Sequence, residues 1–497
     1  MMEELITQWY YFFSEIVRLI LSPSIIGGML AGALIGYTVG ILPGLTAVMG
    51  MSLLLGFCFK LPYDVGFALL IGIYTGAMHT GGITSILINI PGTPAAAATT
   101  LDGFPLAKKG KAREAVGAVI MASAVGEILS VFILLVALPL FAMVALKFGD
   151  WEIFLFCVMG ILVVGALSGR DPVKGWIAGV LGLFIATIGL ENIYAYSRFT
   201  FGILELEKGI GFVPALIGLF GLTEIFMVLK ERIPYKIIGE RGFARIDLSI
   251  VKKYFVTILR STLIGLWIGF IPGVGESVSP WIAYDMAKRS SKNREEFGKG
   301  CIEGVVAAEV ADNTTLAGAL IPTLIFGVPG SGPTAVILAA LFIYGIRPGP
   351  LLLIEKPTFL ATIAALIFLS SIVCFIVASL LSRYAITILT LPREIILPIA
   401  AALCVLGTWG SQFTVFDIWI MFIFGIIGCL MRIGGFPIPP MVLGILIGGI
   451  TDLHLRRALV QHSTDLFGLI TRPAGLAIIV LLLLMLYYGR KVGRGKD

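Results

Sequence analysis

Hydroxyl, amide and carboxyl groups gather in two stretches of the sequence that are otherwise apolar. Residues 66–100 contain no Lys, Arg, Asp or Glu, and their only histidine is His79. Residues 300–346 contain Glu303, Glu309 and Asp312 but no basic residue. A carboxylate at the centre of a bilayer costs about 3 kcal/mol, so such groups usually face a cavity, a partner or a transported ion. These residue types predict binding of a small ligand or an ion.

The charge balance of the two stretches favours transport of a cation together with an anion. A di- or trianionic substrate meets no fixed positive charge in either stretch, and each helix N-terminus supplies only about half a unit of charge. We therefore expect Na⁺ or H⁺ to be bound as a coupling ion. The residues expected to hold it are Asp312, Asn313, Thr315 and His79.

Two of these expectations have alternatives. A lone histidine such as His79 is more often a hydrogen-bonded structural residue of an apolar helix than a proton carrier. Basic residues from other segments could also meet an anionic substrate, and Arg170, Arg198 and Arg347 are the candidates.

A motif of the form G-x-x-x-G-x-x-P-G occurs once in each half of the chain. It runs from Gly36 to Gly44 and again from Gly265 to Gly273. A second Pro-Gly pair follows each copy, 48 residues on at Pro91 and 57 residues on at Pro329. Small residues alone are weak evidence because they recur wherever membrane helices pack closely. Two copies in the same order indicate an internal repeat.

Each Pro-Gly pair should interrupt a helix inside the membrane, since proline removes a backbone donor and glycine loosens the helix. Irregular backbone at that depth is tolerated only where it is buried in protein or lines a wet cavity. The interrupted ends offer N–H groups with partial positive charge, which suit carboxylates. A packing kink explains one break, but four matched breaks favour a binding site. The residues expected to bind substrate are Pro43, Gly44, Thr46, Thr80, Gly81, Gly82, Ser85, Asn89, Pro91, Gly92, Thr93, Pro272, Gly273, Gly275, Ser279, Asn313, Thr314, Pro329, Gly330 and Ser331.

Membrane helices must position these motifs, because the composition is too apolar for a soluble protein. Of 497 residues, 58% are hydrophobic and 13% are charged, against about 25% charged residues in ordinary soluble domains. Windows such as 359–382 and 415–431 are long enough to cross a bilayer. We expect an all-α polytopic membrane protein with about 11–14 spans or half-spans. Its two repeats should be inverted and contain re-entrant or broken helices.

Basic loops indicate the orientation in the membrane. They lie at 107–113, 230–253 and 288–299, with a basic tail at 490–496. Lys and Arg favour the cytoplasmic side, so we place all four there and read the net charge of +6 as a sign of orientation, not of nucleic-acid binding. The predicted divisions are a first membrane half at 1–229, a basic connector at 230–253 and a second membrane half at 254–497.

Cysteine and histidine patterns give no sign of a metal site. The six cysteines lie singly in apolar stretches without a C-x-x-C pair, and the three histidines are scattered. We expect no cofactor beyond the coupling ion.

The sequence resembles the large membrane (permease) subunit of the tripartite tricarboxylate transporter family, TctA. The resemblance covers nearly the whole chain and is dense around both motif regions. It is carried by Asn89–Ala95, Leu101–Gly110, Phe270–Gly273, Glu296–Gly300, Gly318–Thr323, Val328–Ser331 and Arg347–Pro350. Departures occur at Thr80–Gly82, at Gly275–Pro280 and at Asp312–Asn313, within the expected site.

The resemblance implies an uptake system of three parts in the bacterial inner membrane. A periplasmic binding protein would deliver a small di- or tricarboxylate, and a small membrane subunit of about four spans would join this chain. Transport would be secondary-active and cation-coupled, which agrees with the lack of a G-x-x-x-x-G-K-[ST] phosphate loop. The resemblance also implies re-entrant hairpins and elevator-like motion.

Two other classes of function remain open from the residues alone. An intramembrane protease would need a base beside the serine of Gly330-Ser331-Gly332, and none is evident. A channel or a structural subunit would show neither saturation nor coupling to a gradient. We therefore expect a transporter and not an enzyme.

Overall fold

The computed structural model describes residues 2–42, 45–167, 171–191, 195–230, 242–271, 275–389, 393–461, 472–473, 475–476 and 478–480. Pro43, Gly44, Pro272 and Gly273 therefore lie outside the described residues, as do residues 231–241 of the connector and the basic tail. The described elements of the first half are α1 (Met2–Ile20), α2 (Pro23–Ile41), α3 (Ala47–Leu55), η1 (Gly56–Lys60), α4 (Tyr63–Ile88), η2 (Pro94–Ala97), α5 (Thr100–Lys108), α6 (Ala112–Ala145), α7 (Asp150–Leu167), α8 (Pro172–Ala186), β1 (Gly189–Leu190), β2 (Ser197–Arg198), η3 (Leu204–Lys208), α9 (Phe212–Leu216), η4 (Ile217–Leu222) and α10 (Thr223–Lys230).

The second half continues in the same way, with helices throughout its described residues. Its elements are α11 (Ser249–Lys253), α12 (Phe255–Phe270), α13 (Gly275–Ser290), η5 (Arg294–Glu296), α14 (Ile302–Phe326), α15 (Gly332–Ile343), α16 (Leu352–Glu355), α17 (Phe359–Leu381), η6 (Ser382–Tyr384), α18 (Ala385–Leu389), α19 (Arg393–Gln412), α20 (Val415–Ile433) and α21 (Ile438–Gln461). The prediction of an all-α protein is confirmed. Within the described residues the sheet structure consists of one antiparallel pair of two-residue strands, β1 and β2.

The apolar helices confirm a polytopic membrane protein. Six helices of the described chain are long and apolar enough to cross a bilayer, and five shorter apolar helices accompany them. The long ones lie at Pro23–Ile41, Ala112–Met143, Phe212–Leu229, Phe359–Leu389, Val415–Ile433 and Ile438–Gln461. Helices α4 and α14 have 26 and 25 residues, but they carry the polar stretches and are almost wholly buried among other helices.

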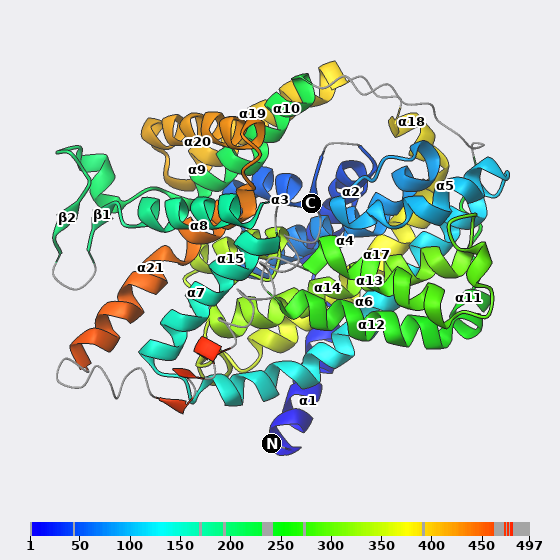
Figure 1. Cartoon of the computed structure of the whole chain (residues 1–497), viewed down its shortest axis with the longest axis horizontal. Helices are drawn as coiled ribbons and strands as arrows, with labels where there is room; N and C mark the ends of the chain where they lie inside the picture. The colour runs from blue at the N-terminus through cyan, green and yellow to red at the C-terminus, as the bar shows by residue number, and fades with distance from the viewer. Residues whose placement is uncertain are drawn as a thin grey trace.

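The helices form two groups, which Figure 1 shows side by side. In one group α2 packs on α4, and α12 and α13 pack on α14. Helix α6 contacts both of these sets, and α17 packs on α2, α4 and α6. In the other group α21 packs on α7 and α8, while α20 packs on α9 and η4. Helices α3 and α15 contact members of both groups and so connect them. Elements from both halves of the chain contribute to each group.

The backbone of α4 and its following turn repeats in α14. Asn89 and Gly327 each end their helix in the left-handed conformation, with φ of 59° and 68°. Adding 238 to a residue number in the first segment gives the matching residue in the second, so 89 becomes 327 and Pro91-Gly92 becomes Pro329-Gly330. This shared register confirms the internal similarity that the sequence motif indicated.

Close packing of glycines fixes the same geometry twice. Gly36 on α2 lies against Ile73, and Gly265 on α12 lies against Ala311, which is Ile73 shifted by the same 238. A Cβ on either glycine would meet the backbone of the facing helix, so only glycine permits this approach. The G-x-x-x-G motif thus brings α2 onto α4 and α12 onto α14.

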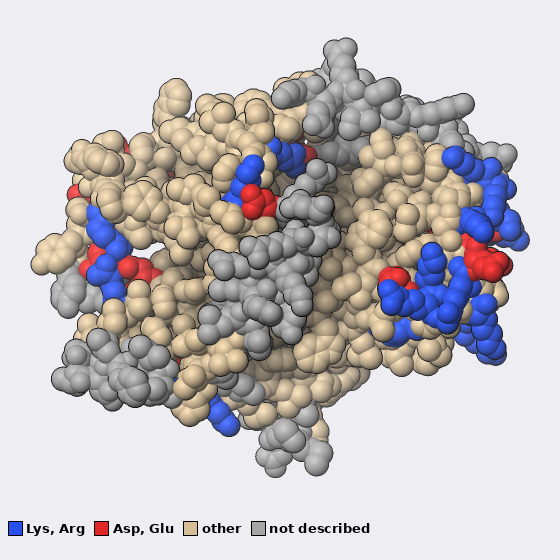
Figure 2. Space-filling view, viewed as in Figure 1, with Lys and Arg blue, Asp and Glu red and all other residues tan. Residues whose placement is uncertain are grey.

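Three predicted cytoplasmic loops lie together at one end of the molecule. Arg113 donates to the carbonyl of Phe243 at 2.8 Å, which joins the first loop to the connector. Asp102 joins the α13–α14 loop: its Oδ1 accepts the N–H groups of Gly298, Gly300 and Cys301 at 2.8–2.9 Å, and Oδ2 accepts Tyr284. Lys and Arg gather at this end, around α5 and α11, and β1 and β2 lie at the opposite end (Figures 1 and 2).

Candidate functional site

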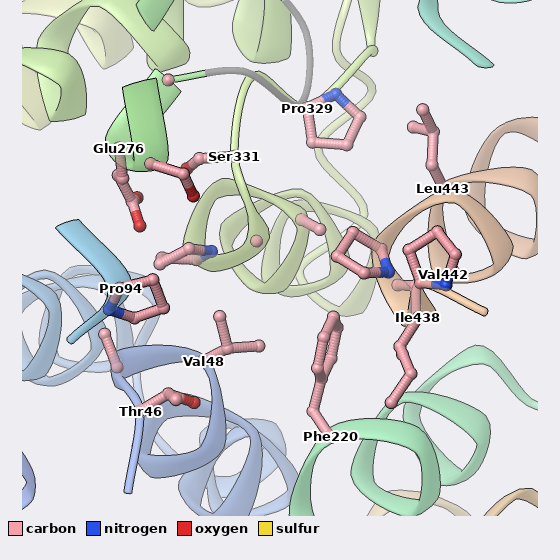
Figure 3. Close-up of a pocket in the computed structure, with 18 of the residues that line it drawn as sticks. Thr46, Val48, Pro94, Phe220, Glu276, Pro329, Ser331, Ile438, Val442 and Leu443 are labelled. Atoms are coloured by element: carbon pink, nitrogen blue, oxygen red, sulfur yellow. The ribbon is translucent and has the colours of Figure 1, made fainter. Parts of the chain in front are cut away.

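A cavity of about 440 Å³ lies between the two helix groups. Its wall includes residues from all four Pro-Gly regions: Thr46, Thr93, Glu276 and Ser331 each follow one of them. The opposite wall comes from η4, α10, the end of α20 and the start of α21. Figure 3 shows Glu276 and Ser331 side by side, with Ile438, Val442 and Leu443 across the space and Phe220 below.

Local packing explains why the Pro-Gly turns reach the cavity. The N–H of Gly92 donates to the carbonyl of Gly81 at 3.1 Å, which folds the turn back along α4. Gly330 packs equally closely in the second repeat, where a Cβ would lie 2.5 Å from Cα of Ala319 and 2.8 Å from the carbonyl oxygen of Gly269. Each turn is therefore held by a glycine that has no room for a side chain.

New helices begin where the turns end. Ser331 caps α15 with a capping box, in which its hydroxyl accepts the N–H of Thr334 and the Thr334 hydroxyl accepts the N–H of Ser331. Thr46 caps α3 by accepting the N–H of Met49 at 3.2 Å. Helix N-termini of this kind direct partial positive charge toward the space they face, which suits an anion.

Glu276 joins the two repeats at the cavity wall. The hydroxyl of Tyr74, on α4, donates to Oε1 of Glu276, on α13. The same hydroxyl lies 3.1 Å from Oγ of Ser331. Tyr74 is fully buried, so this link ties the polar wall of the cavity to the interior of α4.

Behind this wall, two further carboxylates are buried among hydrogen-bond donors. Glu127 on α6 accepts the hydroxyl of Thr75 at 2.7 Å and lies 2.8 Å from Nε2 of His79. Glu309 on α14 accepts the hydroxyls of Thr99 at 2.5 Å and Ser123 at 3.3 Å. Both carboxylates are fully buried, so a proton or a paired charge must accompany each of them.

Asp312 differs from these carboxylates in having no such donors. It is 1% exposed, and neither carboxylate oxygen has a hydrogen-bond partner among the described residues. The adjacent Asn313 donates to the carbonyl of Glu309 at 2.9 Å, while its own Oδ1 also lacks a described partner. Three oxygen atoms on one buried helix turn are thus left for a ligand or a proton.

The predicted binding residues fall into two sets. Those that line the cavity are Thr46, Thr93, Gly275, Pro329 and Ser331. The others described lie in the surrounding helix contacts and turns: Thr80, Gly81, Gly82, Ser85, Asn89, Pro91, Gly92, Ser279, Asn313, Thr314 and Gly330. For example, Thr80 donates to the carbonyl of Gly76 and Ser279 to that of Ala311. Their roles in binding stay predictions.

The predicted ion-coupling residues are similarly spread. Asp312, Asn313 and Thr315 share one stretch of α14, where the Thr315 hydroxyl donates to the carbonyl of Asp312 at 2.5 Å. His79 lies on α4 and is paired with Glu127 instead. Its Nδ1 has no partner among the described residues.

Several polar residues of the site were not among the predicted binding or ion-coupling residues, although one of them, Glu276, lies in a stretch that the sequence analysis placed within the expected site. They are Tyr74, Glu127, Glu224, Glu276 and Arg432. Glu127 could have been found by following single charges through every apolar stretch, because α6 has 34 residues and one carboxylate at its centre. Arg432 pairs with Glu224 in the cavity wall, whereas Arg198 pairs with Asp452, Arg347 is exposed outside the cavity, and Arg170 lies outside the described residues.

Comparison with known proteins identifies the family of the chain. The family model described as the tripartite tricarboxylate transporter TctA family matches residues 26–443. A 52.8 kDa protein of Agrobacterium vitis, named for the TAR-I ttuC' 3' region, is 33% identical over 476 residues, covering 93% of this chain and 94% of the relative.

A second protein of Agrobacterium vitis, named for the TAR-II ttuC' 3' region, is shorter. It is 30% identical over 228 residues, which is 45% of this chain and 94% of the relative. No solved structure matches the chain.

Proposed function

The chain belongs to the tripartite tricarboxylate transporter TctA family, and on that premise we propose that it is the subunit through which a small di- or tricarboxylate crosses the bacterial inner membrane. Membership makes it a multi-pass membrane component of a transport system and not an enzyme. The proposal adds that uptake is secondary-active, cation-coupled and fed by a periplasmic binding protein. It also includes a small four-span membrane subunit as a partner.

The observation that supports substrate binding is the convergence of all four Pro-Gly regions on one cavity. Its volume of about 440 Å³ lies in the range of small-molecule pockets, roughly 300–1,000 Å³. Hydroxyls of Thr46, Thr93 and Ser331 and two capped helix N-termini line it. These groups suit the oxygen atoms of a carboxylate.

The charges of the lining support cation coupling. Its ionisable residues among those described are Glu224, Glu276 and Arg432, which sum to one net negative charge when all are ionised. A carboxylate substrate adds further negative charge, so a cation is needed for electrostatic balance. Asp312 lies behind the cavity wall with unpartnered oxygens, which makes it the first candidate for the Na⁺ or H⁺ site. No cofactor beyond this ion is proposed.

Uptake into proteoliposomes tests this function directly. The chain would be reconstituted with its small subunit and binding protein, and labelled citrate, succinate and malate would be offered. Each compound would be run under an imposed Na⁺ gradient and, separately, under a proton gradient. We expect saturable accumulation under one gradient, lost when the binding protein is omitted.

The outcomes separate the proposal from its alternatives. Flux that neither saturates nor responds to a gradient would indicate a channel. Folded protein that accumulates none of the three compounds under either gradient would contradict carboxylate uptake. Accumulation that persists without the binding protein would contradict the tripartite part of the proposal alone.

A further inference from the structure

An ion pair forms part of the cavity wall opposite the Pro-Gly turns. Arg432, in the last turn of α20, places a guanidinium nitrogen 2.9 Å from Oε2 of Glu224, in the first turn of α10. Both residues line the cavity, and Arg432 is the one Lys or Arg among its described lining residues. Among the described residues the cavity therefore has a single fixed positive charge, and the carboxylate of Glu224 is paired with it.

Close helix packing sets the position of this pair. Gly425 and Gly428 lie on the same face of α20 as Arg432 and pack against Leu222 and Thr223, the two residues before Glu224. The Thr223 hydroxyl donates to the carbonyls of Gly218 and Gly425 at 3.1 Å, which connects the π-helical segment η4 to α20. The guanidinium is thus positioned at the cavity by α20, and Gly425 and Gly428 of this helix have no room for a side chain where they pack against Leu222 and Thr223.

We propose that Arg432 binds a carboxylate group of the substrate, and that Glu224 holds the guanidinium in the empty cavity and competes with the substrate for it. This inference rests on the function proposed above and names the residue that recognises the anion. A planar guanidinium can donate two parallel hydrogen bonds to one carboxylate, and it carries a full positive charge where a helix N-terminus carries about half. Glu224 also keeps Arg432 from standing unpaired between transport cycles.

Competition predicts opposite effects for the two partners. Arg432→Gln removes a charge-assisted contact and should raise the KM for uptake roughly 10- to 100-fold. Glu224→Gln frees the guanidinium and should lower KM by roughly 2- to 5-fold. The double variant should resemble Arg432→Gln, because Glu224 acts through the arginine. Arg432→Lys should recover part of the lost affinity.

The experiment measures KM in the complete reconstituted system for whichever of citrate, succinate and malate the unmodified protein accumulates. Inhibition by succinate and by its monoamide, succinamate, adds a readout of charge recognition. The unmodified protein should prefer succinate, and Arg432→Gln should lose most of that preference. A protein in which the pair is only structural would lose thermal stability and keep the preference.

Arg18 provides a matched control. Its side chain is 43% exposed, against 41% for Arg432, and it is paired with Asp64 and also with Glu15, but it lies outside the cavity. Arg18→Gln should therefore leave KM unchanged.

The two proposals fail in different ways. Failure of the unmodified protein to accumulate any of the three carboxylates overturns the proposed function. Normal uptake by the unmodified protein, together with unchanged KM and unchanged preference in folded Arg432→Gln or Arg432→Lys, overturns the role of Arg432 alone. A raised KM in Glu224→Gln overturns the competition.

Discussion

Asp312 combines burial with a carboxylate that has no hydrogen-bond partner among the described residues. A buried carboxylate without hydrogen bonds is costly unless it holds a proton or a bound cation. We expect Asp312→Asn to abolish gradient-driven accumulation while preserving exchange of labelled for unlabelled substrate. The reason is that a neutral amide cannot carry the negative charge that would bind the coupling cation and so link the cation gradient to substrate uptake. Accumulation and counterflow in the same proteoliposomes measure the two activities.

Asp417 supplies the control for this variant. It is also buried in an apolar helix, but its carboxylate accepts the hydroxyl of Thr414 at 2.8 Å and lies outside the cavity lining. Asp417→Asn should leave the ratio of accumulation to counterflow unchanged. Equal accumulation by Asp312→Asn and the unmodified protein would remove Asp312 from the coupling mechanism.

Asp102 is also fully buried, but unlike Asp312 both of its carboxylate oxygens accept hydrogen bonds. One oxygen accepts three backbone N–H groups from the loop before α14. Asp102→Ala would strand those donors, and each buried unsatisfied group costs about 1–3 kcal/mol. We expect a loss of at least about 2 kcal/mol in stability, seen as a lower Tm in detergent.

An exposed carboxylate on α13 allows comparison. Asp285 pairs with Arg289 at 2.7 Å, and both side chains are more than half exposed. Because exposed pairs contribute little, Asp285→Ala should change Tm far less than Asp102→Ala. Equal effects of the two substitutions would argue against the N–H cluster as the source of stability.

The Pro-Gly turns depend on glycine for reasons of space. In Gly330→Ala the new methyl group would press on Ala319 and on the carbonyl of Gly269. Such overpacking costs about 1–3 kcal/mol, and it should also displace Ser331 from the cavity wall. We expect both a lower Tm and a higher KM for uptake.

Gly27 tests whether the effect comes from packing. It lies within α2, and a Cβ there meets nothing within 4 Å. Gly27→Ala should be neutral or slightly stabilising, since alanine favours helix over glycine by roughly 0.5–1 kcal/mol. If Gly330→Ala leaves Tm and KM as unchanged as Gly27→Ala does, close packing at Gly330 is not required for stability or for uptake.

The helical architecture and the Pro-Gly turns could be predicted from sequence because they depend on local patterns. Apolar runs mark the helices, and the paired G-x-x-x-G and Pro-Gly motifs mark the close packing and the turns. Partners across the fold leave no such pattern. Tyr74 looks like any aromatic residue of an apolar helix, and Arg432 looks like a residue that reaches the membrane interface from a helix end. Their roles follow from Glu276 and Glu224, each on another helix.

The largest gathering of Lys and Arg lies at one end of the molecule, opposite the β1–β2 hairpin, and α12 runs along the long axis of Figure 1. If the basic end is cytoplasmic, the β1–β2 hairpin faces the periplasm. We expect a membrane-impermeant thiol reagent to label Lys109→Cys only from the cytoplasmic side and Phe201→Cys, 87% exposed, only from the periplasmic side. Labelling of both from one side would place the long axis in the membrane plane.

Ancestry accounts for the shared register of α4 and α14. Two segments with one backbone path, one left-handed helix end and one Pro-Gly turn are the mark of a gene segment that was duplicated. The duplicates have since diverged in chemistry, because Ile71 and Tyr74 stand where the second segment has Glu309 and Asp312. One descendant kept or gained the carboxylates while the other supplies the hydroxyl that reaches Glu276. The two segments thus differ in chemistry, although both end in the same left-handed turn before Pro-Gly.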